Sequence, residues 1–160
     1  MKNLLSITAI ALLLSAFSLP TTTFAKGIDI GVKSIHLDDS SASPNSASAR
    51  SSTYEIDVHV EGKSVSSLTI MLPEEVSVGS VEVTDSSGKT VTATSTIKDK
   101  KVAIAFINPI APAIILQVRL LNASTRWGYS NTWLLPVSAK VDGITSELPL
   151  GLARIQTYAH

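Results

Sequence analysis

The chain has 160 residues, 13 basic and 13 acidic side chains, and no cysteine. This even charge balance gives the protein no electrostatic attraction to nucleic acid or to anionic lipid. The lack of cysteine excludes disulfides, thiolate metal sites and a lipid-modified cysteine, and the length suits a single domain.

The first segment has the form of a secretory signal peptide. Lys2 precedes an uncharged, largely apolar run from Leu4 to Leu19, and residues 21–25 are mostly small and polar. Because Thr23 and Ala25 fit the small residues that signal peptidase requires, we predict cleavage after Ala25. The alternative is an uncleaved anchor, although the run is shorter than the roughly 20 residues of a spanning helix. We expect an exported protein, periplasmic or extracellular, without a membrane span after cleavage.

The next segment divides into two parts. Residues 26–37 carry recurring apolar side chains and predict a first strand. Residues 38–52 are rich in serine and alanine, and we interpret them as a linker because they bury little apolar surface. The predicted organisation is a signal peptide over 1–25, a first strand and Ser/Ala-rich linker over 26–52, and a β-sandwich domain over 53–160.

Alternation of apolar and polar residues dominates from residue 53 onward. Turn signals such as Asp142-Gly143 separate the alternating runs, and Pro136 predicts an edge position or a bulge. No segment has a convincing helical period. We therefore predict an all-β fold, an immunoglobulin-like antiparallel β-sandwich of about seven to nine strands without disulfides. The expected strands cover residues 54–60, 68–72, 81–83, 91–97, 102–106, 114–120, 133–141 and 150–158.

One strand offers a candidate metal site. Strand alternation puts Asp57, His59 and Glu61 on one face, where two carboxylates and an imidazole could bind a divalent ion. Successive same-face residues are about 7 Å apart, so one strand rarely completes a coordination shell. We favour a solvated strand face, and we expect no bound metal and no cofactor.

The sequence shows no catalytic motif. No serine lies in a Gly-x-Ser-x-Gly turn, and neither His36 nor His59 has a recognisable nucleophile nearby in the sequence. We therefore predict that the protein is not an enzyme and assign no catalytic residues.

The segment 122–131 is the most informative loop. It combines Arg126, Trp127 and Tyr129 with glycine, serine and asparagine between two predicted strands. Exposed aromatic residues and arginine are typical of binding surfaces, so these three residues form a predicted partner-binding site. The alternative is that Trp127 folds back to cap the core. Trp133 follows the strand alternation and is predicted to lie in the core.

Several short motifs extend along the domain: the segment 106–112 (Phe-Ile-Asn-Pro-Ile-Ala-Pro), Gln117-Val-Arg119, and the ending Leu150-Gly151-Leu-Ala-Arg154-Ile-Gln-Thr-Tyr158. On these motifs, residues 53–158 resemble a family of exported, chiefly cyanobacterial proteins catalogued as domain of unknown function 2808. The resemblance implies an envelope β domain and no catalytic residues. The sequence departs from the family at Ala113, where the family tends to have glycine. We expect Gly151 to permit a close backbone approach on the last strand.

These features favour a non-enzymatic exported β-sandwich with a binding or structural role in the bacterial cell envelope. Its expected partner is an envelope protein or a glycan, and not nucleic acid. The first alternative is a small periplasmic metal- or ligand-binding protein that uses Asp57, His59 and Glu61. The second is a hydrolase whose site the sequence does not reveal.

Overall fold

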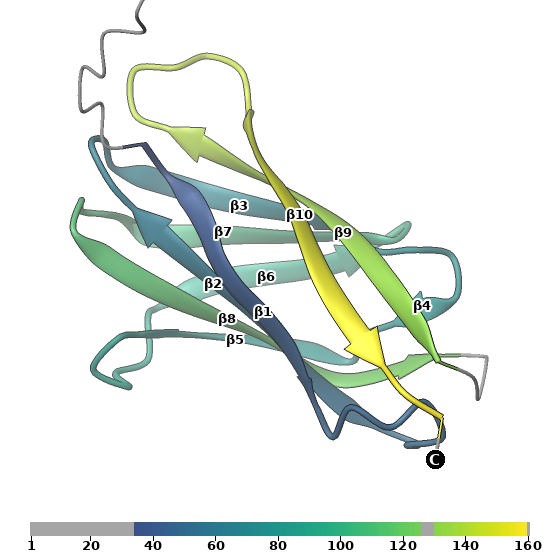
Figure 1. Cartoon of the computed structure of the whole chain (residues 1–160). Helices are drawn as coiled ribbons and strands as arrows, with labels where there is room; N and C mark the ends of the chain where they lie inside the picture. The colour runs from purple at the N-terminus through teal and green to yellow at the C-terminus, as the bar shows by residue number, and fades with distance from the viewer. Residues whose placement is uncertain (1–33, 126–129, 160) are drawn as a thin grey trace, which may run out of the picture. The chain divides into compact units, whose positions relative to one another are not determined.

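The computed structural model describes residues 34–125 and 130–159, and within them all regular secondary structure is β-strand (Figure 1). Ten strands form two five-stranded sheets in which the paired strands are antiparallel. No helix in this part of the chain is long and apolar enough to cross a membrane.

The first sheet has β8 near its centre. Its order is β1, β2 and β8, and both β5 and the short β4 pair with the other edge of β8. These strands are β1 (His36–Ser43), β2 (Ser52–Val60), β4 (Val76–Ser77), β5 (Ser80–Asp85) and β8 (Ile114–Thr125).

The second sheet has the order β10, β9, β3, β7 and β6. Its strands are β3 (Val65–Met71), β6 (Ala93–Lys98), β7 (Lys101–Ile110), β9 (Asn131–Val141) and β10 (Leu148–Thr157). The two sheets pack face to face. The apolar side chains at alternating positions of their strands fill the space between them.

The core is built from the inward-facing residues of that alternation. On β2, Tyr54, Ile56, Val58 and Val60 are buried, and the residues between them are only partly buried. Burial raises the pKa of Tyr54 to about 12. The other sheet contributes buried residues such as Ile70, Ile104, Leu135 and Ile155. The predicted antiparallel β-sandwich without disulfides is confirmed, but the described residues form ten strands and not seven to nine.

The structure differs from the expected elements at the start of the domain. Residues 38–43 were expected in a Ser/Ala-rich linker but belong to β1, which pairs with β2 from His36–His59 to Ser43–Thr53. A strand at the edge of a sheet gains its backbone hydrogen bonds from one neighbour and needs few apolar side chains. Most of the predicted first strand, 26–37, lies outside the described residues.

Two predictions about β9 had different outcomes. Trp133 is buried in the core, as the alternation predicts. Pro136 lies on an inner strand and not at an edge. The other predicted possibility, a bulge, has a counterpart close by, since the β9–β10 register shifts between Pro149 and Gly151, opposite Ser138 and Val137. The register between β3 and β9 ends with Ile70 opposite Val137, so Pro136 falls just beyond the last paired residue of that ladder. Its missing N–H therefore removes no bond from the β3–β9 ladder.

Backbone geometry explains two motif residues. Ala113 has a φ of 69° in the connection between β7 and β8, and its N–H donates to the carbonyl of Val60 at 2.8 Å. This is the left-handed region that favours glycine. Gly151 has a φ of 137°, and a Cβ added there would meet only Leu37 Cδ1 at an ordinary 3.7 Å. Glycine is therefore favoured at 151 by its φ, and not by the close approach of another backbone segment that the sequence predicts.

Candidate functional site

The edge strands β1 and β10, which belong to different sheets, meet along one side of the sandwich (Figure 1). The Ser40 hydroxyl accepts a hydrogen bond from the Arg154 N–H at 2.9 Å and donates to the Arg154 carbonyl at 3.2 Å. Further along, the Tyr158 N–H donates to the Asn45 carbonyl, and the Ala47 N–H donates to the Tyr158 carbonyl, both at 2.8 Å. These four bonds connect the two sheets.

A shallow groove follows this contact between β1 and β10. It consists of three adjoining depressions that share Gln156, and the last of them has a volume of about 340 Å³. We call it the seam groove, and its lining residues are Leu37–Ala42, Asn45, Ser130–Thr132, Leu152–Arg154 and Gln156–Tyr158. Most of these side chains carry hydrogen-bonding groups, so the groove is suited to a polar ligand.

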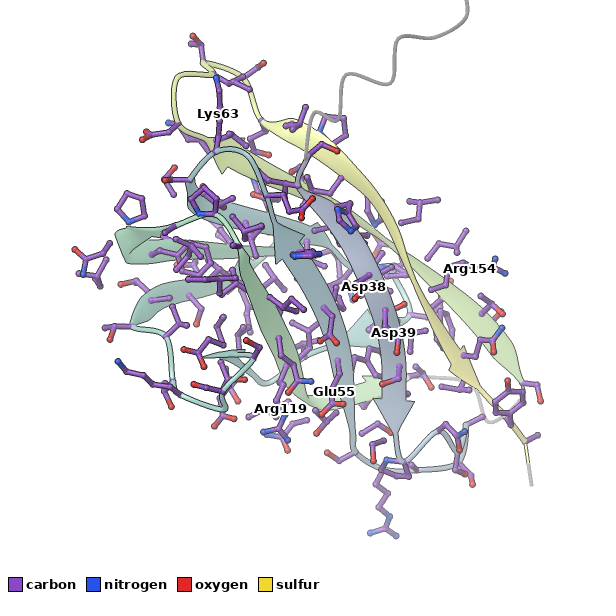
Figure 2. The ribbon with its side chains drawn as sticks, turned by 60° about the vertical axis from the view of Figure 1, so that its left-hand side comes forward. Asp38, Asp39, Glu55, Lys63, Arg119 and Arg154 are labelled. Atoms are coloured by element: carbon purple, nitrogen blue, oxygen red, sulfur yellow. The ribbon has the colours of Figure 1, made fainter. Side chains whose placement is uncertain are left out.

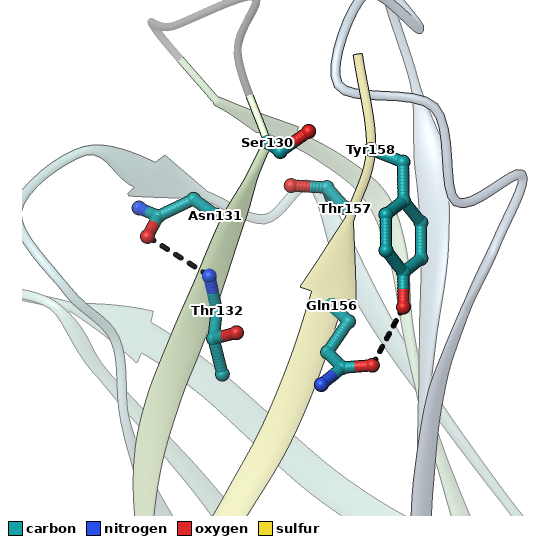
Figure 3. A pocket seen from close by; sticks show the side chains of 6 residues that line it. All are labelled: Ser130, Asn131, Thr132, Gln156, Thr157 and Tyr158. Atoms are coloured by element: carbon teal, nitrogen blue, oxygen red, sulfur yellow. Dashed lines mark hydrogen bonds between the residues drawn. The ribbon is translucent and has the colours of Figure 1, made fainter. Parts of the chain in front are cut away.

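Tyr158 forms an exposed aromatic surface in the groove. Its side chain is 44% exposed, and its hydroxyl donates to Gln156 Oε1 at 2.7 Å (Figure 3). Its backbone is held by the bonds to Asn45 and Ala47 described above. Below this surface, the buried Trp133 Nε1–H donates to Thr157 Oγ1 at 3.2 Å. The ring is therefore positioned before any ligand arrives.

Acidic side chains cover much of the outer face of the first sheet. Arg119 lies between two of them, with 3.3 Å from its Nε to Glu55 Oε1 and 3.2 Å from Nη1 to Glu82 Oε2. Asp38 and Asp39 lie on the same side of the sheet as Glu55 and Arg119 (Figure 2). Because one guanidinium faces several carboxylates, this face has an excess of negative charge.

Asp57 lies among these acidic residues. Its Oδ1 is buried and has no hydrogen-bond partner. Burial raises the pKa of the Asp57 carboxyl above its ordinary value, and the negative charges of Asp39, Glu55 and Asp38 raise it further. A hydrogen bond with the Gln117 side chain acts in the opposite direction. These surroundings disfavour the negatively charged form of Asp57.

The predicted metal-site residues are only partly brought together. His59 Nε2 lies 3.7 Å from Glu61 Oε1, and the His59 ring is 5.1 Å from that of His36 on the paired strand. The pKa of Asp57 responds instead to the charges of Asp39, Glu55 and Asp38. Within 34–125 and 130–159, no group of three or more histidine, aspartate or glutamate side chains could hold a metal ion.

The predicted partner-binding residues Arg126, Trp127 and Tyr129 lie outside the described residues. The chain is described again at Ser130, which lines the seam groove and whose Oγ accepts a hydrogen bond from the Ala159 N–H at 2.9 Å. The sequence alone does not identify Gln156, Tyr158 and Asn45 as site residues. Their only signal in the sequence is that each is polar or aromatic near the end of a predicted strand or in a serine-rich segment.

No family model matches the chain, and no curated protein matches it in sequence. The solved structures that resemble it include the following two. A collagen-binding domain from a Staphylococcus aureus adhesin is 4% identical, with a TM-score of 0.48 over 78% of this chain and 96% of that domain. ChBD3 from Thermococcus kodakarensis KOD1 is 12% identical, with a TM-score of 0.30 over 79% of this chain and 93% of that one. Neither likeness identifies a ligand for this protein.

Proposed function

We propose that this protein is a non-enzymatic binding domain that is exported to the periplasm or beyond and binds an envelope protein or glycan. The observation that carries the proposal is the seam groove, where hydrogen-bonding side chains gather around an exposed, prepositioned tyrosine ring. Rigid aromatic surface with adaptable polar groups beside it is typical of recognition sites. The proposed export depends on the apolar leader, and membership of the exported family remains part of this proposal.

The described residues support a binding role over a catalytic one. The His36 Nδ1–H donates to the Ser34 carbonyl at 2.8 Å, and its ring lies against that of His59. His59 in turn lies beside Glu61. Neither imidazole has a serine or threonine hydroxyl among the bonds described, so no activated nucleophile is formed in this part of the chain.

The metal-binding alternative has weaker support. A metal site built on Asp57, His59 and Glu61 needs these side chains to converge, and among the described residues no group of three or more such side chains could hold a metal ion. Elemental analysis of the protein, purified without chelator, tests this alternative. Stoichiometric zinc or copper that disappears in His59→Ala would favour the metal-binding function.

We propose that the loop 122–131 extends the binding surface, with Arg126, Trp127 and Tyr129 as contact residues. Ser130, which follows them directly, already lines the seam groove. Trp127→Ala should leave the melting temperature nearly unchanged. It should weaken the affinity for partners captured from a bacterial envelope extract by roughly 30-fold, as truncation of an interface hot spot does.

The control is Leu134→Ala, which truncates an exposed apolar side chain on β9 outside the lining of the groove. It should not reduce capture. If Trp127→Ala lowers the melting temperature strongly while capture by the folded protein is unchanged, Trp127 caps the core and the loop is not the binding surface.

A further inference from the structure

We infer that the seam groove binds an uncharged polysaccharide chain, with a sugar ring stacked on Tyr158 and hydroxyl groups bonded to the polar side chains along β1 and β10. This inference rests on the proposed binding function and names the class of its ligand. Its basis is the combination of an exposed ring, a row of hydrogen-bonding groups and a closed backbone contact along one groove.

The closed contact between β1 and β10 argues against a peptide strand as ligand. A strand that joins a sheet edge needs free backbone groups on that edge and about 4.8 Å of space beside it. Here the Ser40 hydroxyl is hydrogen-bonded to both the N–H and the carbonyl of Arg154. The backbone N–H and carbonyl of Tyr158 are likewise bonded to the backbone of Asn45 and Ala47. The ligand must therefore bind to the side chains above the strands.

The side chains fit the two surfaces of a sugar. A pyranose ring has apolar C–H faces, which pack on an aromatic ring, and a rim of hydroxyls, which donate and accept hydrogen bonds. Tyr158 offers the ring, and Gln156 and Asn45 offer amide groups close to it. Because the Tyr158 hydroxyl is bonded to Gln156, the ring loses little freedom on binding.

The charges along the groove favour an uncharged glycan over an acidic one. Asp38 and Asp39 line the end near Leu152, and the acidic face of the first sheet begins beside them. The Arg154 side chain extends from β10 on the side away from β1 (Figure 2). Arg154 also lines the groove, so a uronic acid or a sulfated sugar would meet two carboxylates and a single guanidinium there, which on balance costs free energy.

The groove is also long enough for several sugars. It extends beside β10 from Leu152 to Tyr158, which at about 3.3 Å per strand residue is roughly 20 Å. A chain of several linked sugars would occupy all three depressions at once. We therefore expect affinity to rise with the length of the oligosaccharide until the groove is filled.

Affinity electrophoresis and calorimetry of the purified protein test this inference. The probes are soluble neutral β-glucan and N-acetylglucosamine oligosaccharides of increasing length, with polygalacturonate as the acidic comparison. At least one neutral series should bind with affinity that increases with length. Tyr158→Ala should weaken that binding on the order of tenfold or more. Tyr158→Phe keeps the aromatic ring and should retain most of the binding affinity.

Ile107→Ala is the matched control, since it truncates an exposed apolar side chain on β7 of the second sheet. Melting temperatures verify that every variant is folded. Preference for the acidic polymer, or neutral binding that Tyr158→Ala leaves unchanged, would overturn the inference. If no glycan binds but envelope proteins are captured, the ligand class is wrong and the proposed function stands. If neither is captured, the proposed function itself fails.

Discussion

Asp57 is a half-buried acidic residue whose surroundings disfavour its negative charge. Among the described residues, its Oδ1 is the one buried side-chain oxygen or nitrogen without a hydrogen-bond partner. The folded-state pKa lies above the ordinary value of 3.8, so the folded protein holds more protons than the unfolded chain in the window above that value. Stability therefore falls as the pH rises through this window, and the cost is fully present at neutral pH.

Replacing this carboxylate by an amide should relieve the cost. We expect Asp57→Asn to raise the melting temperature at pH 7, because the amide has the same shape without the charge. The difference should shrink as the pH falls below the folded-state pKa and should vanish when Asp57 is protonated in both states. Thermal melts of both proteins across pH 3 to 8 measure this.

Glu74→Gln, on the connection between β3 and β4, is the control that removes one carboxylate from an exposed position. It should not reproduce the gain at pH 7. A lower melting temperature for Asp57→Asn at pH 7 would show instead that the Asp57 charge is used, for example by a bound cation.

Individual residues differ in how far the sequence predicts their role. Trp133 follows a regular alternation, and its burial could be predicted from that pattern. The outward direction of Asp57, His59 and Glu61 was equally predictable, since side chains alternate along a strand. Tyr158 could not be assigned to a site, because its neighbours Asn45 and Ala47 are more than a hundred residues earlier in the chain.

At the scale of single elements, the sequence did not predict the two-residue β4 or most of β1. The β1 strand is the more informative case. Its residues Asp38 to Ser43 include no strongly apolar side chain, and the usual alternation signal is missing. Pairing with β2 supplies its backbone bonds, and Ser40 connects it to β10. A polar edge strand also resists pairing with other molecules. Its polarity made it look like a linker.

Ser40→Ala should weaken the connection between β1 and β10. The change removes both hydrogen bonds to the Arg154 backbone. Since these bonds are exposed to water, we expect a loss of about 1 kcal/mol in the free energy of unfolding. Urea denaturation measures it, and Ser41→Ala, on the exposed side of the same strand, is the matched control. Equal losses in the two variants would contradict the connecting role of Ser40.

The connection between β7 and β8 contains a correctable strain. Ala113 has a φ of 69°, which costs a residue with a side chain roughly 1–2 kcal/mol. Glycine removes this cost but has more freedom to lose on folding, roughly 0.5–1 kcal/mol. We therefore expect Ala113→Gly to stabilise the protein by about 0.5–1 kcal/mol in urea denaturation. Ala111→Gly, two residues earlier and without a positive φ, should destabilise it.

For the whole molecule, the fold class could be predicted and the arrangement of the sheets could not. Alternation indicates which side chains face inward, and the absence of helical periods excludes other classes. It does not indicate which strands are neighbours. The partners β1 and β10, whose contact creates the seam groove, are the first and last strands of the described chain. A site that forms where they meet leaves no local motif.

Export is a prediction about the whole chain. If residues 1–25 act as a signal peptide, expression of the full sequence in a bacterium should give a periplasmic or secreted product whose intact mass matches residues 26–160. Lys2→Glu should slow this processing, because the leader needs a positive amino-terminal region. A membrane-bound product that still contains Met1 would contradict cleavage after Ala25.

The contact between β1 and β10 also determines when folding can finish. Ser40 and Arg154 are 114 positions apart, so their contact closes almost the full length of the domain. Contacts this distant in sequence form slowly, because a large loop must be ordered first. During synthesis, β1 leaves the ribosome long before β10. The contact between the two sheets along this side then stays incomplete until nearly the whole domain has been made.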